Sequence, residues 1–109
     1  MTSLQSRIRD DLAAAMRDRD MARVKVLRTT ISAIQNAEAV EGVASVEGVV
    51  GYSDVQRQSL TDNDVVEIIV REIDEFERSV AEYRRIGQTE RADGLQRELE
   101  VLRSYLNPD

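Results

Sequence analysis

The chain has 109 residues, enough for one domain but too few for two independent ones. It contains no Cys and no His, which excludes disulfide frameworks, thiolate metal sites, Cys nucleophiles and the usual zinc, haem and Ser-His chemistries. The formal net charge is -6, but residues 1–40 hold seven basic and five acidic side chains, so any electropositive surface is expected in this first third.

The composition and the N-terminus indicate a helical protein of the cytoplasm. Charged residues make up 33% of the sequence and aromatic residues only 4%, a profile typical of helices that face solvent. The N-terminus lacks the apolar core of a secretory signal, and no segment approaches the roughly 18 apolar residues of a membrane span. We therefore expect a cytoplasmic chain that makes no contact with a membrane.

Residues 3–18 predict a first helix whose N-terminus is capped by Ser3. Its apolar residues recur at helical spacing and are expected to face inward: Leu4, Ile8, Leu12, Ala15 and Met16. Residues 20–42 predict a second helix, capped by Asp20 and ending at Gly42 in a left-handed turn. Its inward positions are Val24, Leu27, Ile31 and Ile34. Because the joint between them is short, the two helices should be antiparallel neighbours.

Residues 40–60 break the helical pattern with three Gly and a Val-Glu-Gly-Val tetrad that occurs at 40–43 and again at 46–49. A connection of roughly 20 residues is uncommon inside a compact domain, and such segments tend to be functional or disordered. We expect a Val/Gly-rich loop here, as a small hairpin flap or as a disordered segment.

Residues 61–87 predict a third helix, with Thr61 as its cap and Gly87 just beyond its end. Its apolar residues step alternately by three and four, which makes a heptad seam: Val66, Ile69, Ile73, Phe76, Val80 and Tyr83. A fourth helix is predicted from Thr89 to Asn107, where Pro108 stops it. Its seam is Ala92, Leu95, Leu99, Leu102 and Leu106. Gly94 lies inside this helix at a cost of roughly 1 kcal/mol against Ala, so either something packs closely there or the helix is weak.

These elements predict an all-α fold, a four-helix bundle made of two antiparallel helical hairpins with the Val/Gly-rich loop between the second and third helices. We expect their apolar ridges to close on one dry interior that leaves no cleft. The fourth helix is predicted to cover only part of the third, which would leave apolar surface around Ile68, Ile69 or the Val-Glu-Gly-Val loop open to a protein partner or to a second copy in a homodimer.

Two segments resemble the YqeY family, relatives of the tail region of the GatB subunit of tRNA-dependent amidotransferases. They are VLRTTISAIQNAE, which begins at Val26, and LTDNDVVEIIVREIDEFERSVAEYRRIGQTERADGLQRELEVLRSYLNP, which begins at Leu60. The residues that follow the order and spacing of that family are Leu27, Arg28, Arg71, Glu72, Ile73, Ser79, Tyr83, Gly87, Glu98, Leu102, Tyr105 and Leu106.

The resemblance implies an all-helical fold and a link to glutamine-dependent amidation of misacylated tRNA. It implies no catalytic centre in this region. Members of the family usually continue past the Tyr-Leu-Pro ending into a second small helical domain, so we expect residues 1–109 to form one YqeY-like domain without that C-terminal tail domain. The family also commonly shows a basic run after Arg-Glu-Ile, where this sequence has Asp74, Glu75, Phe76 and Glu77, an acidic surface that would repel phosphates.

No arrangement of residues predicts a catalytic, cofactor or metal site. Ser and Thr nucleophiles lack a His base, and no glycine-rich phosphate loop follows a strand. Glu72 and Glu98 stand beside the heptad seams, where ion pairing with Arg28 or Arg71 is the expected role and acid–base catalysis the alternative.

One basic cluster surrounds the first interhelical turn and is the candidate contact for RNA or for a partner: Arg17, Arg19, Arg23, Lys25 and Arg28. Asp18 and Asp20 dilute it, and no aromatic residue lies nearby in the sequence, so tRNA binding through it would be weak.

The function predicted from the sequence is that of a non-catalytic helical interaction module, an accessory to GatB-type tRNA-dependent amidotransferases. Its partner would be an amidotransferase subunit or a second copy of the chain. Two alternatives stay open: weak tRNA binding, and the carbon–nitrogen ligase activity with glutamine as amido-N-donor that the family association implies.

Overall fold

The four predicted helices are confirmed. A computed structural model describes residues 2–46 and 60–107, with the side chains of 2–39 and 60–107. The helices are α1 (Leu4–Asp18), α2 (Met21–Val46), α3 (Asp62–Arg85) and α4 (Thr89–Ser104), and the described residues contain no strand. The expected loop or flap falls mostly on residues 47–59, outside the described residues.

Three of the helices begin at the side-chain caps that the sequence predicts. The Ser3 hydroxyl accepts the Ser6 N–H at 3.1 Å, and the Asp20 carboxylate accepts the Arg23 N–H at 3.3 Å. At α3, Thr61 and Asp64 form a reciprocal capping box, in which each side chain accepts the N–H of the other residue. Each cap satisfies amides that have no partner inside the helix.

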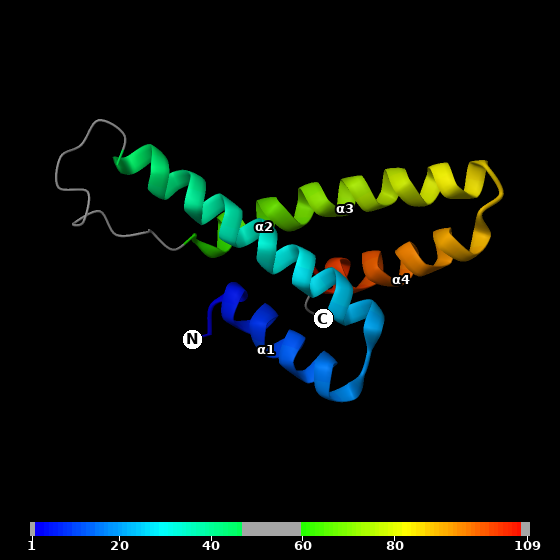
Figure 1. Cartoon of the computed structure of the whole chain (residues 1–109), viewed down its shortest axis with the longest axis horizontal. Helices are drawn as coiled ribbons and strands as arrows, with labels where there is room; N and C mark the ends of the chain where they lie inside the picture. Colours follow the sequence, from blue (N-terminus) through cyan, green and yellow to red (C-terminus); the bar gives the residue numbers. More distant parts are fainter. Residues whose placement is uncertain (1, 47–59, 108–109) are drawn as a thin grey trace.

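The turn from α3 to α4 depends on Gly87, whose φ of +80° lies in the left-handed region that Gly adopts without strain. The Gly87 N–H donates to the Arg84 carbonyl and the Gln88 N–H to the Tyr83 carbonyl, which is the Schellman pattern of a helix C-terminus. This turn reverses the chain and makes α3 and α4 an antiparallel hairpin (Figure 1).

The predicted end of the second helix at Gly42 is wrong, because α2 continues through this residue to Val46. Gly in a helix interior costs only about 1 kcal/mol against Ala, and no Pro follows to break the backbone hydrogen bonds. Residues 40–46 therefore belong to the helix and not to the loop.

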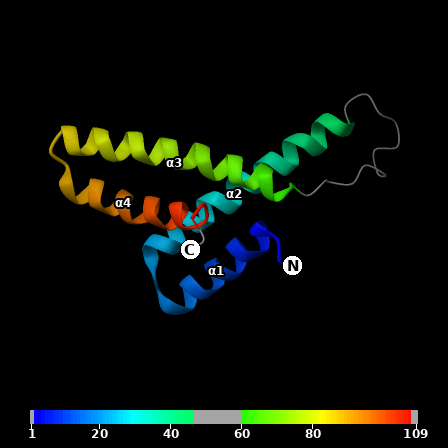
Figure 2. The same ribbon diagram turned by 180° about the vertical axis from the view of Figure 1, so that it is seen from behind.

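Two hairpins, α1–α2 and α3–α4, make the bundle. Figures 1 and 2 show α2 crossing the α3–α4 hairpin at an angle, with the tip of that hairpin extending past the crossing. Both α2 and α3 contact each of the other three helices, so these two elements join the hairpins.

The core lies where the hairpins cross. Its buried members come from all four helices and their flanks: Leu4, Ile8, Val26, Leu27, Ile34, Leu60, Val65, Ile68, Ile69, Leu102 and Tyr105. The expectation that Ile68 and Ile69 are open to a partner is wrong, since they are 5% and 0% exposed. The start of α3 packs on α2 and α1 as well as on α4, so more than one face of this helix is buried there. Met16, predicted to face inward, is half exposed at the end of α1.

None of the helices in the described ranges is both long enough and apolar enough to cross a membrane.

Candidate functional site

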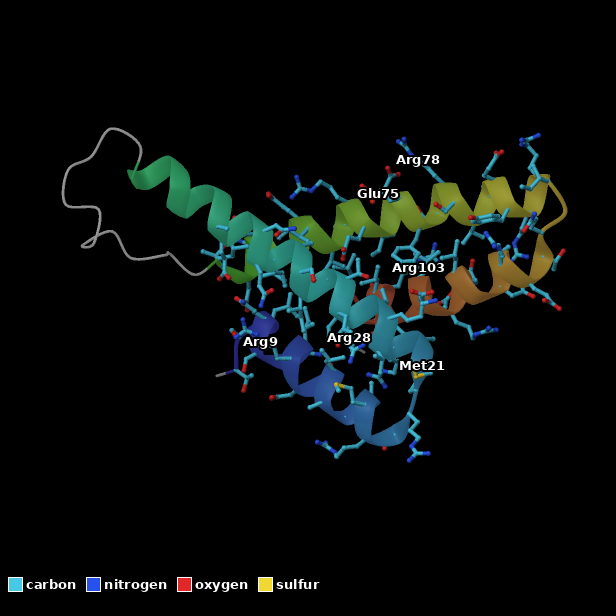
Figure 3. The ribbon with its side chains drawn as sticks, in the orientation of Figure 1. Arg9, Met21, Arg28, Glu75, Arg78 and Arg103 are labelled. Atoms are coloured by element: carbon cyan, nitrogen blue, oxygen red, sulfur yellow. The ribbon has the colours of Figure 1, made fainter. Side chains whose placement is uncertain are left out.

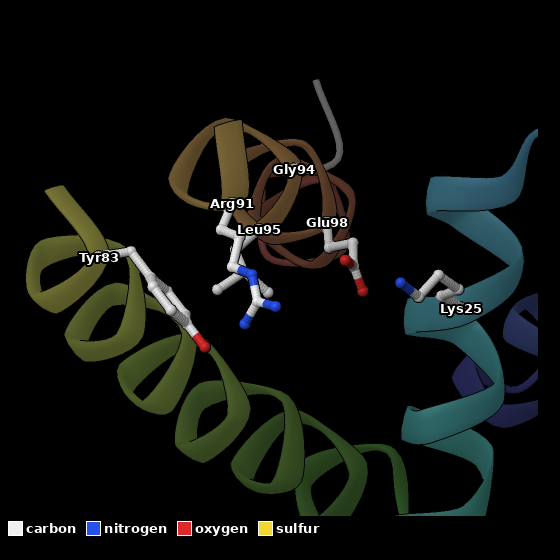
Figure 4. A pocket seen from close by; sticks show the side chains of 6 residues that line it. All are labelled: Lys25, Tyr83, Arg91, Gly94, Leu95 and Glu98. Carbon is white, nitrogen blue, oxygen red and sulfur yellow. The ribbon is translucent and has the colours of Figure 1, made fainter. Parts of the chain in front are cut away.

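The described part of the bundle has a cleft between α2 and α4, which we call the α2–α4 cleft. Its first lobe, of about 300 Å³, lies toward the hairpin tip and is lined by Lys25, Tyr83, Arg91, Gly94, Leu95 and Glu98 (Figure 4). Its second lobe, of about 460 Å³, lies toward the α1–α2 turn and is lined by Arg19, Asp20, Met21, Ala22, Lys25, Gly94, Arg97 and Glu98. The lobes meet at Lys25, Gly94 and Glu98.

This cleft corrects the prediction that the helices close on a dry interior with no cleft. Because α2 crosses the other hairpin at an angle, the two elements diverge away from the core (Figures 1 and 2). Long charged side chains line the space between them. The core itself stays apolar, and the cleft lies beside it.

Helical spacing explains which side chains reach the cleft. On α4, Arg91, Leu95 and Glu98 follow one another at four and three residues, which places them on one face of the helix. From α2, Lys25 extends toward that face, and Figure 4 shows its ammonium group and the Glu98 carboxylate pointing toward each other across the cleft.

The cleft is electropositive in a chain whose net charge is negative. Four cations line it, Arg19, Lys25, Arg91 and Arg97, against two carboxylates, Asp20 and Glu98, so the formal charge of its lining is +2. The whole chain carries -6. The expectation that any positive surface lies in the first third is therefore wrong in part, since α4 supplies two of the four cations.

Glu98 is nearly buried, with 9% of the residue exposed, yet no hydrogen bond or ion pair within the described residues satisfies its carboxylate. Every fully buried side-chain oxygen of the described structure has a hydrogen-bond partner. Since the Glu98 oxygens have none, they are not fully buried and still reach solvent. Burial raises the pKa of this carboxyl, and the positive charge of Lys25 opposes that shift. The carboxylate is thus open to a hydrogen-bond donor that enters the cleft.

The first lobe also has a flat wall. The guanidinium of Arg91 lies over the Tyr83 ring, 5.7 Å from its centroid, and Leu95 beside them is half-buried. Planar guanidinium and phenol groups are the side chains on which flat rings stack.

Gly94 lies between the lobes, and no described residue packs against it closely enough to require a glycine. A Cβ added there would meet only the Arg97 Nη2 atom, at 3.9 Å, which is an ordinary contact. Of the two readings of this glycine, close packing by the protein is therefore wrong. The helix bears a cost of roughly 1 kcal/mol against Ala, and the result is open space on the wall of the cleft.

The structure divides the predicted basic cluster. Arg19 and Lys25 line the cleft, whereas Arg23 lies on the other side of α2, near Tyr105, where its charge partly offsets the rise in the pKa of that phenol that burial and Asp11 cause. Arg17 and Arg28 are exposed and line neither lobe. Sequence reasoning missed Arg91, Arg97 and Tyr83 as companions of Lys25, because they are far away along the chain.

The predicted ion pairs have other arrangements. Glu72 accepts a hydrogen bond from the buried Thr30 hydroxyl at 2.7 Å. Burial raises the pKa of Glu72, the Thr30 hydrogen bond lowers it and the charge of Glu75 raises it. Within the described residues no ion pair of 4.0 Å or less joins Arg28 or Arg71 to Glu72 or Glu98, because both arginines lie on exposed faces of their helices.

The side chains in the cleft suit binding better than bond making. Its charged groups can hold an anion and accept one hydrogen bond, but its lining has no Ser, Thr or Cys nucleophile. In residues 2–39 and 60–107, no three Asp or Glu side chains are grouped in a way that could hold a metal ion.

Comparison with known proteins gives a family. Residues 5–109 match the family model described as "Yqey-like protein". A search of curated proteins finds no match.

Proposed function

Because the chain belongs to the family of YqeY-like proteins, whose pattern covers residues 5–109, we propose that it is a non-catalytic helical accessory module in tRNA-dependent amidation. The relation of these proteins to the tail region of the GatB amidotransferase subunit suggests that setting. The module acts by binding, and its partner is an amidotransferase subunit or a second copy of the chain.

The observation that carries this proposal is the cleft, which has groups for holding a ligand and no Ser, Thr or Cys nucleophile for attacking one. Carbon–nitrogen ligase activity with glutamine as amido-N-donor requires glutamine hydrolysis, for which a nucleophile and a base must meet. The raised pKa of Glu72 has a structural explanation, since its carboxylate bonds Thr30 between α2 and α3. The ligase reaction is therefore assigned to the partner.

Exposed apolar residues offer this module contact points for a protein. Among the described side chains, four large apolar ones are about half exposed or more: Met16, Met21, Val70 and Ile86. Val70 and the half-buried Val66 line a shallow depression on α3 together with Glu67 and Arg71. Mixed apolar and charged surfaces of this kind are typical of contacts that form and dissociate.

An amidation assay with purified components tests the proposal. The chain alone should neither hydrolyse glutamine nor amidate Glu-tRNA, and it should change the rate or the tRNA affinity of a GatB-type amidotransferase when added to it. Amidation by the chain alone would overturn the non-catalytic assignment. An amidotransferase that responds to the chain and to an unrelated helical protein alike would overturn the accessory role.

Weak tRNA binding is a second candidate, favoured by the position of Arg19 and Lys25 in an electropositive cleft. Replacing Arg19 and Lys25 together by Ala should weaken tRNA binding and reduce its salt dependence, because fewer counterions are released. Replacing Arg17 and Arg28 by Ala removes the same charge outside the cleft and is the matched control. Equal losses of tRNA affinity for both pairs would indicate general charge attraction and would contradict a tRNA site in the cleft.

A further inference from the structure

The α2–α4 cleft contains a glycine, Gly94, whose cost to the helix no contact with a described residue explains. A methyl group at Gly94 would fit beside Arg97 without displacing any atom, and it would favour the helix. Glycine in such a position permits close approach of another molecule to the backbone. A ligand that lies across Gly94, where the two lobes meet, accounts for its presence.

The two lobes differ in chemistry, and together they match the parts of one molecule. The second lobe holds three cations that can bind a phosphate, Arg19, Lys25 and Arg97, and the carboxylates of Asp20 and Glu98 also line it. The first lobe holds the stacked Tyr83 and Arg91, on which a flat ring can lie. Phosphate and planar base are joined in a nucleotide by a sugar, which would then cross the junction of the lobes.

At that junction Glu98 presents carboxylate oxygens with no partner in the described structure. A carboxylate is an acceptor only, so it selects a ligand that brings hydroxyl or amino hydrogens to this point. Ribose hydroxyls are such donors, and carboxylates bind them in other nucleotide sites. Lys25, opposite Glu98, keeps the junction from repelling the neighbouring phosphate (Figure 4).

We propose that the α2–α4 cleft binds a ribonucleotide, with its phosphate in the second lobe, its base in the first lobe and its ribose over Gly94 beside Glu98. The nucleotide comes either free or as a unit of an RNA chain. The proposal concerns the isolated chain and holds whether or not the accessory function is correct.

Calorimetric titration of the purified chain with AMP, inorganic phosphate, adenosine and 2′,3′-dideoxy-AMP tests the proposal. AMP should bind more tightly than phosphate, which fills only the second lobe, and more tightly than adenosine, which leaves the second lobe empty. The dideoxy nucleotide should bind several-fold more weakly than AMP, and Glu98→Ala should abolish this difference. A single-stranded hexamer of adenylate provides the RNA arm: tighter binding than AMP assigns the site to RNA, and equal binding assigns it to free nucleotides.

Charge variants separate the cleft from general attraction. Lys25→Gln and Arg97→Gln should each weaken binding by about tenfold, as the loss of a charge-assisted hydrogen bond does. Arg78→Gln makes the same charge change on α3, where Arg78 points away from the bundle (Figure 3), and should stay within about twofold. Failure of AMP and of the hexamer to bind would overturn the proposal, and so would equal losses in all three variants.

Gly94→Ala gives two readouts of opposite direction. It should raise the Tm, because Ala favours the helix, and lower the affinity for the bound nucleotide, because its methyl group occupies the junction. Ser79→Ala on the exposed face of α3 is the control for an added helix former, and it should leave the affinity unchanged. A Gly94→Ala variant that binds like the wild type would overturn the position of the ribose.

Lysine labelling locates the ligand without any mutation. Lys25 is the one lysine of the sequence, so a reagent that acylates amines reports on the cleft at this residue and on the N-terminus as an internal control. Saturating AMP or hexamer should slow the acylation of Lys25 and leave the N-terminal amine unaffected. Equal protection of both amines, or of neither, would place the nucleotide elsewhere and overturn the proposal.

Discussion

At the scale of single residues, a buried hydroxyl joins the two hairpins. Thr30 on α2 is fully buried, and its hydroxyl lies 2.7 Å from a carboxylate oxygen of Glu72 on α3. The same hydroxyl lies 3.0 Å from the Val26 carbonyl of its own helix. Hydrogen bonds to charged groups contribute more than neutral ones, and a half-buried carboxylate that loses its donor also keeps its desolvation cost.

Thr30→Val should lower the free energy of unfolding by about 1–3 kcal/mol, because the methyl group keeps the packing but leaves Glu72 without its donor. Thr29→Val is the matched control, since Thr29 is exposed and its hydroxyl bonds only the Lys25 carbonyl among the described residues. Urea unfolding followed by circular dichroism measures both. Similar losses in the two variants would mean that the Glu72 contact contributes nothing.

The pH dependence of stability should report on Glu72. Its folded pKa lies above the usual 4.5, mainly through burial, so the folded state holds the proton more tightly than the unfolded state. The contribution of this group is therefore largest at low pH and is lost as pH rises from about 4.5 through the raised pKa. Glu72→Gln should gain stability relative to the wild type across this window, measured by thermal unfolding at several pH values. Glu67→Gln, on the exposed face of the same helix, should show no such gain.

The sequence predicted residue roles that depend on near neighbours. Ser3, Asp20 and Thr61 cap helices through hydrogen bonds that span three residues, so a short stretch contains both partners. The partner of Glu72 is 42 residues away, and only the crossing of α2 and α3 brings Thr30 to it. The sequence suggested an arginine as the partner of Glu72, but Arg28 and Arg71 are exposed to solvent.

At the scale of the helix, the α3–α4 hairpin has two glycines with opposite roles. Gly87 ends α3 in the left-handed region with φ of +80°, where a side chain causes strain although space is free. Gly94 has ordinary helical surroundings, and a side chain there relieves the low propensity of glycine. The same substitution should therefore change the stability of one hairpin in two directions.

Gly87→Ala should lower the free energy of unfolding by about 1–2 kcal/mol, the cost of a left-handed residue with a Cβ. Gly94→Ala should raise it by up to about 1 kcal/mol. Chemical denaturation of the two variants beside the wild type measures the pair, and each variant is the control for the other. A loss at Gly94 would show that the cleft wall packs more tightly than its geometry indicates.

The presence of each helix could be predicted from the sequence, but the residues at which the helices end were harder to predict. The seams of α3 and α4 repeat over several turns, so their period is unmistakable. The end of α2 depended on a single glycine, whose cost of about 1 kcal/mol is too small to stop a helix of 26 residues. The buried positions of α3 also differ from the predicted heptad seam. The heptad pattern predicted Val66 as a buried position, whereas Val65 is fully buried and Val66 only partly.

At the scale of the whole molecule, the candidate site arises from the angle between two hairpins. Arg19 and Lys25 belong to the first hairpin, and Arg91 and Arg97 to the second. Residues 89–109 contain three basic and five acidic side chains, so no segment sum could have shown that α4 supplies two cations to the cleft that Lys25 lines. The bundle could be predicted because the apolar residues of each helix repeat within a short stretch of sequence. The cleft could not, because it depends on the angle between two hairpins, which no short stretch determines.

The two hairpins are also tied by a hydrogen bond between Tyr105, just after α4, and Asp11, in the middle of α1. The Tyr105 hydroxyl donates to the Asp11 carboxylate on α1 at 2.5 Å, while burial and Asp11 raise the pKa of the phenol. Tyr105→Phe keeps the buried ring and removes this bond, so it should cost about 1–2 kcal/mol and speed hydrogen exchange of α1 amides. Tyr83→Phe is the control at the far tip of the hairpin, where no described residue bonds the hydroxyl, and it should change stability by less than about 0.5 kcal/mol. If hydrogen exchange in Tyr105→Phe rises equally along α1 and along the α3–α4 tip, the bundle opens as one unit. The Tyr105–Asp11 bond would then stabilise α1 no more than the other helices.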